Sequence, residues 1–255
     1  MSIRKIEEGS TPAGGDIRIN ILPKGPYEVY GRPPLAVQCI MPDTGGESRH
    51  FQQGRRFSTQ ENPVHLCRCG ASERKPYCDG SHTRTEWNPE LDSREEGLLD
   101  NVEITEGGSV TLTDNERYCV FARFCHPAGG AWELTAQSDD PQARQLAIRE
   151  ASMCPTGRLM AWDRRSGKPF EYEFEPSLGL IEDIQLGVSG GLWVRGGIPV
   201  STTDGRTFEI RNRVVLCRCG RSSNKPYCDG THVSAKWRDN LDGEPAEATV
   251  PEKVY

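Results

Sequence analysis

The sequence predicts a β-rich α+β protein in which two similar halves flank a small insert that contains one main helix. Three observations support this class: a cysteine motif that occurs twice, many short segments of strand-like alternation, and one long stretch free of Gly and Pro. The 255 residues include 27 Gly and 18 Pro, and 35% are hydrophobic. A chain this lean in apolar residues favours several small modules, some stabilised by metal, over one large core.

The first half is predicted to consist of short strands. Ile17, Ile19 and Ile21 alternate with polar residues, which is the period of a strand. Further strands are predicted at residues 27–31, 35–40 and 64–66.

The second half repeats this order. Strands are predicted at residues 180–184, 192–197 and 208–216, with a break at 189–191. Trp87 and Trp237 each lie five residues after the histidine of their motif. The sequence therefore predicts an internal duplication that covers both flanks of the chain.

The insert is predicted to carry the main helix. Asp140 is a good N-cap, Pro141 suits the first turn, and residues 142–152 lack Gly and Pro. Strands are predicted around it at residues 110–112, 159–162 and 170–174. The predicted domains are residues 1–100, 101–176 and 177–255.

Composition narrows the class of protein. The net charge is −6 without a basic stripe, which argues against nucleic acid or an anionic membrane as a partner. The sequence has no apolar run that would span a bilayer, and its N-terminus lacks a signal-peptide core, so we expect a cytoplasmic protein. Ten cysteines without an export signal favour metal ligation over disulfides.

The repeated motif predicts two four-ligand metal sites. In each copy one residue separates the first two cysteines, eight separate the second from the third, and three separate the third from a histidine. The ligand sets are Cys67, Cys69, Cys78 and His82, and, 150 residues later, Cys217, Cys219, Cys228 and His232.

The spacing within a copy suits two irons or one zinc. The first two cysteines can share one iron on a tight turn, and Cys78 and His82 lie four apart, as on one face of a helix starting near Pro76. Three thiolates and one imidazole also make a common zinc site. Spacing alone leaves both metals open.

Both copies resemble the CDGSH iron–sulfur domain of the NEET proteins, whose motif ends in Cys-Asp-Gly-Ser-His. Residues 78–82 match that ending outright, and residues 228–232 differ in having Thr231 in place of Ser. The resemblance implies one [2Fe–2S] cluster on each set of three cysteines and one histidine. NEET proteins are dimers that exchange a strand, so we expect the same arrangement inside this chain. It would be a monomeric pseudo-twofold in which residues 27–31 and 192–196 are exchanged.

A single histidine ligand has two consequences. Neutral imidazole in place of a thiolate raises the reduction potential, and protonation of the imidazole would release the iron. We therefore predict a one-electron carrier or redox relay that meets a redox partner protein. The alternatives are a cluster storage or transfer protein that serves an apo-acceptor, a redox sensor, or a subunit of a larger oxidoreductase. The sequence shows no nucleophile–base pair, phosphate loop or dinucleotide fingerprint, so an enzyme is the weaker hypothesis.

Cys119, Cys125 and Cys154 form a further constellation in the insert. Residues 117–163 resemble the divergent single-cluster ferredoxin domain that often accompanies CDGSH domains, although that family closes on Cys-Pro-Ser-Gly-Ala and this chain has Thr156 and Arg158. The resemblance implies a third cluster, either [3Fe–4S] or a [4Fe–4S] cluster with another fourth ligand, for which His126 is the nearest candidate. The alternative is three cysteines packed as small apolar residues.

Three other residues are notable. Cys39 lies in an apolar strand pattern and is expected in the core. Arg68 and Arg218, each between paired cysteines, are expected to lower the cluster charge, to dock an acidic partner, or to be solvated.

Overall fold

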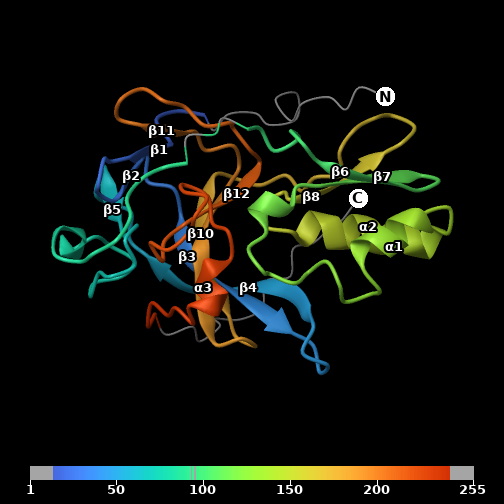
Figure 1. Ribbon diagram of the computed structural model, residues 1–255, viewed down its shortest axis with the longest axis horizontal. Helices are drawn as coiled ribbons and strands as arrows, with labels where there is room; N and C mark the ends of the chain where they lie inside the picture. Colours follow the sequence, from blue (N-terminus) through green and yellow to red (C-terminus); the bar gives the residue numbers. More distant parts are fainter. Residues whose placement is uncertain (1–13, 93, 95, 242–255) are drawn as a thin grey trace.

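The computed structural model describes residues 14–92, 94 and 96–241 as a β-rich protein with short helices (Figure 1). This confirms the predicted α+β class. The strands are β1 (Arg18–Ile21), β2 (Tyr27–Tyr30), β3 (Leu35–Pro42), β4 (Ser48–Phe57), β5 (Val64–Leu66), β6 (Glu103–Glu106), β7 (Val110–Asp114), β8 (Leu159–Asp163), β9 (Ser177–Asp183), β10 (Val188–Arg195), β11 (Val200–Thr202) and β12 (Arg213–Leu216). The helices are α1 (Ala131–Ala136), α2 (Pro141–Met153) and α3 (Thr231–Ser234), with 3-10 turns η2 (Ser81–Thr83) and η3 (Glu116–Tyr118).

The two larger sheets place corresponding strands of the two halves in corresponding positions. Their orders are β11-β1-β2-β5 and β4-β3-β9-β10-β12. The strands β1, β2 and β5 form one antiparallel run, and β9, β10 and β12 form another. A parallel strand from the opposite half extends each run, β11 beside β1 and β3 beside β9. Each sheet is therefore built from both halves.

The crossing strands are not the ones predicted. Residues 27–31 and 192–196 were expected to be exchanged, but β2 pairs with β1 and β5, and β10 pairs with β9 and β12, all within their own halves. The strands that cross are β3 and β11, which follow β2 and β10 along the chain. Side-chain alternation identifies a strand but does not identify its partner, which explains the error.

One apolar core lies between these two sheets. It joins residues of both halves, including Ile19 and Val37 from the first half and Leu192, Val200 and Leu216 from the second. The exchange of β3 and β11 therefore gives the two halves a common core.

The insert forms a separate layer. Strands β6, β7 and β8 make an antiparallel sheet, and helices α1 and α2 lie beside it on one side of the molecule (Figure 1). The Asp140 side chain accepts hydrogen bonds from the backbone N–H groups of Gln142 and Ala143 at 3.0 and 2.9 Å, with Pro141 in the first turn. The predicted start of the main helix is confirmed.

Several local predictions are wrong. Strand β4 was missed because its sequence, SRHFQQGRRF, has no apolar alternation. Residues 170–174 alternate but form no strand, and residues 189–191 are a register shift inside β10 rather than a break. Among the described residues, no helix is long and apolar enough to cross a membrane.

Arg213 of β12 ties the insert to the second half. Its buried guanidinium donates to the carbonyls of Ala151 and Ser152 at 3.1 and 2.8 Å, and also to that of Cys154. It pairs with Glu171 at 3.0 and 2.6 Å. The last carbonyls of a helix lack partners within the helix, so Arg213 satisfies the end of α2 next to Cys154.

We predict that Arg213→Met lowers the free energy of unfolding by about 3–5 kcal/mol, because it leaves the partly buried Glu171 carboxylate and the carbonyls at the end of α2 without their hydrogen-bond donor. Asp140→Ala, which removes the N-cap at the other end of the same helix, should lower it by about 1 kcal/mol. Urea unfolding of both variants measures the difference. Equal losses of unfolding free energy in the two variants would show that Arg213 contributes no more than the N-cap and does not hold the insert to the second half.

Candidate metal centres

The first motif folds as a short hairpin that brings its first two cysteines together. The Cys67 N–H donates to the Pro76 carbonyl at 2.8 Å, and the Cys78 N–H donates to the His65 carbonyl at 2.9 Å. The Sγ atoms of Cys67 and Cys69 lie 3.8 Å apart. The strand β5 thus ends at Leu66, directly before Cys67.

The second motif repeats this geometry after β12. The Cys217 N–H donates to the Pro226 carbonyl at 2.8 Å, and the Cys228 N–H donates to the Val215 carbonyl at 2.9 Å. The Sγ atoms of Cys217 and Cys219 are again 3.8 Å apart.

The third cysteine and the histidine form a second pair in each copy. Cys78 Sγ lies 3.3 Å from His82 Nδ1, and Cys228 Sγ lies 3.4 Å from His232 Nδ1. The four predicted side chains of each copy therefore meet as a thiol–thiol pair and a thiol–imidazole pair. Within the described ranges, no three or more Cys, His, Asp or Glu side chains are arranged to hold a single metal ion.

These Cys–His pairs do not share a helix, contrary to prediction. The residues around Pro76 stay in the hairpin, and the helical turns η2 and α3 begin three residues after the cysteine. Gly80 and Gly230 precede these turns with φ of 85° and 83°. This left-handed conformation interrupts any helix that includes both ligands. A spacing of four residues is compatible with this turn as well as with a helix.

The aspartate of each motif organises the loop. Asp79 accepts hydrogen bonds from the N–H groups of Glu73 at 2.8 Å and Ser81 at 3.0 Å. Asp229 does the same with Ser223 and Thr231. Hydrogen bonds from Ser81 and then Glu73 hold the pKa of Asp79 well below its usual range, so this side chain is an anionic cap rather than a ligand.

The two motifs pack against each other through glycine. Gly70 and Gly220 have φ of 79° and 77°. A Cβ atom added to Gly70 would lie 2.7 Å from the carbonyl carbon of Cys219, and one added to Gly220 would lie 2.8 Å from that of Cys69. The two cysteine loops are thus in reciprocal backbone contact, which no side chain could permit.

Two side chains reinforce this contact. The buried Tyr27 hydroxyl, from the first half, donates to the Cys217 carbonyl at 2.6 Å. Trp237 Nε1, from the second half, donates to the Gly70 carbonyl at 3.3 Å. Each half therefore supports the site of the other.

The two sites differ in burial. Cys78 and His82 are half-buried, whereas Cys228 is 2% exposed and His232 is 5% exposed. Burial, followed by the charge of Arg218, lowers the pKa of His232 to about 4, which keeps this imidazole neutral near pH 7.

The insert causes this difference. Arg117 Nε donates to the Asn224 side chain at 2.8 Å, and the Asn224 amide donates to the Arg117 carbonyl at 3.2 Å. Arg117 also pairs with Asp92 and Glu96. At the corresponding position of the first motif, Arg74 is exposed. The insert therefore covers the second loop and leaves the first open.

The arginines between the paired cysteines are buried structural residues. Arg68 is 2% exposed and donates to the Gly25 carbonyl at 2.9 Å. Arg218 is 5% exposed and pairs with Glu182 at 2.8 Å and with Asp239. The expectations that they are solvated or dock an acidic partner are wrong, because the sequence does not show how deeply the loops are enclosed.

The structure also brings Cys119, Cys125 and Cys154 together. All three are half-buried, and Cys125 and Cys154 pack against the same apolar cluster of the insert. Burial, followed by the neighbouring Cys154 and Cys119, raises the pKa of Cys125 to about 12. The three thiols are therefore close enough to influence one another electrostatically.

Arg158 adds a cation to this group. It donates to both carboxylate oxygens of Asp114, at 2.6 and 2.8 Å. Burial opposes its charge, but Asp114 and the adjacent Cys119 raise its pKa. His126 is exposed, and its ring centroid lies 5.6 Å from that of Trp132.

The insert reaches the second motif through apolar side chains. Val120, Ala122 and Phe124, which lie between Cys119 and Cys125, share one apolar cluster with Cys228. The exposed Phe121 ring packs against Gly230, where an added Cβ would lie 2.5 Å from the ring edge.

Cys39 lies in the core, as predicted. Its side chain is 0% exposed within the apolar cluster between the two large sheets. Burial, followed by Glu182, raises the pKa of its thiol to about 11.

Sequence reasoning missed three residues: Arg158, which lies beside Cys119, Arg213, which bonds the Cys154 carbonyl, and Tyr27, which bonds the Cys217 carbonyl from the first half. The one signal for Arg158 is its place in the Cys154-Pro155 segment. Nothing in the sequence indicates that Tyr27 or Arg213 meets residues far along the chain.

Comparison with protein families agrees with this geometry. The family described as iron-binding zinc finger CDGSH type matches residues 24–83 and 189–233. The family described as divergent 4Fe-4S mono-cluster matches residues 105–164. No curated protein matches the chain, and no solved structure does.

The donor sets and the family matches define an iron–sulfur protein. More specifically, it is a tandem CDGSH protein in which two CDGSH segments flank a divergent single-cluster segment.

We predict that Gly70→Ala and Gly220→Ala each lower the urea midpoint and the iron retained per chain, because a methyl group forces the cysteine loops apart. Gly205→Ala is the matched control: its φ is also positive at 93°, but an added Cβ meets nothing within 4 Å. It should incur only the backbone penalty of about 1–2 kcal/mol. Equal effects at the three positions would contradict the reciprocal contact.

Proposed function

We propose that this protein is a one-electron carrier or redox relay with a [2Fe–2S] cluster at each CDGSH site and a third cluster in the insert. The observation that carries this proposal is the direct contact of each site with the next. Gly70 and Gly220 place the two cysteine loops backbone to backbone, and Cys228 shares an apolar cluster with the segment between Cys119 and Cys125.

The donor geometry supports a two-iron cluster over zinc. Each set of ligands comprises two pairs, with atoms 3.8 Å apart in the thiol pairs and 3.3 or 3.4 Å apart in the thiol–imidazole pairs. Two pairs suit two metals that each take two protein ligands, whereas zinc would draw four donors to one point. When bound, such a cluster supplies reversible one-electron chemistry.

The proposed ligands follow from these pairs. Cys67, Cys69, Cys78 and His82 would hold the first [2Fe–2S] cluster, and Cys217, Cys219, Cys228 and His232 the second. Hydrogen bonding between the paired thiols lowers the pKa of Cys67 and of Cys217 and raises that of their partners Cys69 and Cys219, so without metal each pair favours one thiolate beside one thiol.

The third site rests on Cys119, Cys125 and Cys154. Three thiolates suit a [3Fe–4S] cluster, or a [4Fe–4S] cluster that takes a fourth ligand from elsewhere. Arg158 stabilises negative charge beside Cys119, which supports an anionic group over three apolar cysteines.

The exchange of β3 and β11 supports an intrachain pseudo-twofold. We propose that it replaces the dimer of NEET proteins, so that the protein acts as a monomer with a redox partner protein. Nucleic acid and membrane are not proposed partners. A cytoplasmic location and the domain boundaries 1–100, 101–176 and 177–255 stay predictions.

Iron and acid-labile sulfide per chain, with EPR of oxidised and reduced samples, test the cluster content. We expect about seven or eight irons in the anaerobically purified protein, and about four in a variant with Cys119, Cys125 and Cys154 replaced by Ser. Four irons in both proteins would contradict the proposal of a third cluster. Zinc without sulfide would overturn the whole proposal.

The alternative function, cluster transfer to an apo-acceptor, is favoured by the half-exposed His82. If transfer occurs, it should start at the first site, because His232 is 5% exposed. We predict that His82→Cys slows iron loss to an apo-ferredoxin several-fold, whereas His232→Cys leaves the rate unchanged.

A carrier keeps its iron through repeated reduction and reoxidation, and this retention separates the two functions. Rapid transfer from the wild-type protein, with little iron kept over the cycles, would favour the donor. Equal slowing by both substitutions would contradict the difference in access.

A further inference from the structure

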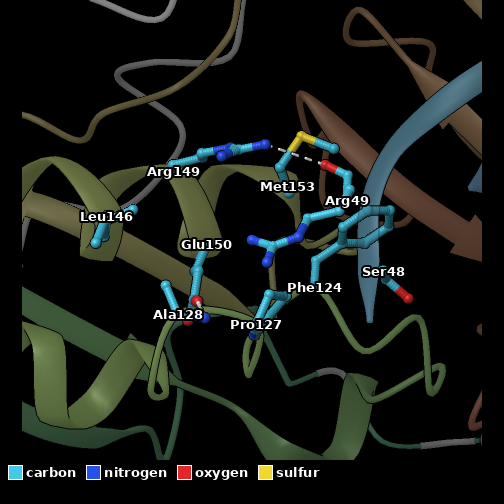
Figure 2. A pocket seen from close by; sticks show the side chains of 9 residues that line it. All are labelled: Ser48, Arg49, Phe124, Pro127, Ala128, Leu146, Arg149, Glu150 and Met153. Atoms are coloured by element: carbon cyan, nitrogen blue, oxygen red, sulfur yellow. Dashed lines mark hydrogen bonds between the residues drawn. The ribbon is translucent and has the colours of Figure 1, made fainter. Parts of the chain in front are cut away.

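Two small recesses of the protein lie beside buried carboxylates. The one beside Glu150 lies between α2, the start of β4 and the loop that precedes α1 (Figure 2). It has a volume of about 20 Å³, which is room for one water molecule. A water there can donate to Glu150 Oε2, which is buried and has no partner among the described residues. This water would satisfy the carboxylate, so nothing at this recess indicates another ligand.

The second recess lies against His232, a proposed ligand of the second site. Its walls include Phe121 of the insert, Asp183 at the end of β9 and His232 of α3. Its volume of about 10 Å³ is the smallest space that holds one water molecule. A single water in this recess can therefore contact both Asp183 and the imidazole.

The imidazole of His232 has one nitrogen left for such a water. Its Nδ1 lies 3.4 Å from Cys228 Sγ, whereas Nε2 has no hydrogen-bond partner among the described residues. A histidine that binds metal through one nitrogen almost always donates from the other to a carboxylate, a carbonyl or a water. The recess provides the space for that acceptor.

Arg123 of the insert holds the Asp183 carboxylate in place. Its guanidinium donates to Oδ2 at 2.5 Å and to Oδ1 at 3.2 Å, and the Leu186 N–H donates to Oδ1 at 2.9 Å. The aspartate is 5% exposed. A carboxylate oxygen accepts about two hydrogen bonds, so Oδ2 has capacity for one more. The carboxylate is thus fixed and can still accept a hydrogen bond from a water.

The backbone of the insert is strained where it forms this recess. Phe121 and Arg123 have φ of 57° and 61°, a left-handed conformation that residues other than Gly rarely adopt. The Phe121 ring packs against Gly230, and Arg123 pairs with Asp183. Strain of this kind persists only where the surrounding contacts fix it, and it is concentrated at functional sites. Both contacts that fix it here join the insert to the second half.

We propose that Asp183 is a positioning residue for His232, which it reaches through one water in this recess. The imidazole donates from Nε2 to the water, the water donates to Asp183, and Nδ1 keeps the lone pair that binds iron. A hydrogen bond toward a carboxylate makes a histidine a stronger donor to its metal. Asp183 therefore lowers the reduction potential of the second site. This inference rests on the proposed [2Fe–2S] cluster at that site and identifies a residue that sets its potential.

A redox titration of the anaerobically purified, iron-loaded chain, followed by EPR, tests this role. His232→Cys changes a ligand of the second site and so identifies the midpoint potential that belongs to it. Asp183→Asn keeps the size of the side chain and removes its charge. We expect it to raise that midpoint by about 59 mV, the one-electron equivalent of a tenfold change, and to leave the midpoint of the first site unchanged.

Two failures of this titration are distinguishable. Absence of [2Fe–2S] signals from the wild type would overturn the proposed function and this inference with it. An unchanged second midpoint in Asp183→Asn, beside intact [2Fe–2S] signals, would overturn this inference alone.

Two further variants separate the charge of Asp183 from its size and its place. Asp183→Glu keeps a carboxylate and should stay closer to the wild-type midpoint than Asp183→Asn does. A larger shift in Asp183→Glu would show that the aspartate acts by packing and would refute the proposal. Asp163→Asn is the control, because Asp163 pairs with Arg144 in the insert and does not line the recess. It should leave the second midpoint unchanged.

A double-mutant cycle separates action through the imidazole from a direct effect of charge. In the His232→Cys background the ligand has no Nε2–H, so Asp183→Asn should shift the second midpoint by less than half as much as it does beside histidine. A shift of equal size in both backgrounds would show that Asp183 acts by its charge alone and would refute the positioning role.

Discussion

The backbone contact between the two cysteine loops is the constraint on which the structure depends. Gly70 lies against the carbonyl of Cys219, and Gly220 lies against that of Cys69. The approach is possible because neither position carries a Cβ. Each loop also follows a strand of a sheet that the opposite half completes. Each large sheet therefore contains a strand of the other half, and each cysteine loop packs against the other.

The insert makes this symmetric core asymmetric. It covers the second loop through Arg117 and Asn224 and places Phe121 against Gly230, while the first loop keeps its outer residues exposed. Two nearly identical ligand sets thus have different access to solvent. The first site is the more open to solvent, and the second site faces the insert. The repeat duplicates the four side chains, and the insert makes the two copies differ in burial.

Sequence reasoning succeeded where information is local. The spacing of cysteines and histidines indicated which side chains come together in pairs, and Asp140 with Pro141 marked the start of α2. It failed where the outcome depends on distant partners. Strand alternation could not reveal that β3 and β11 pair with strands of the opposite half. The polar strand β4 has no apolar alternation by which it could be predicted. The burial of Arg68 and Arg218 depends on enclosure by distant segments, which the sequence does not display.

In each motif a lysine ammonium group is held by the loop close to the first cysteine, so the fold sets the charge around that thiol. The ammonium groups of Lys75 and Lys225 donate to the carbonyls of Ser72 and Ser222 within their own loops. After the hydrogen bonds between paired thiols, these lysines are among the groups that lower the pKa of Cys67 and Cys217. A mobile surface lysine would be screened by solvent, whereas one held on a loop carbonyl keeps its charge beside the sulfur. Each loop therefore places a fixed cation beside its first thiol.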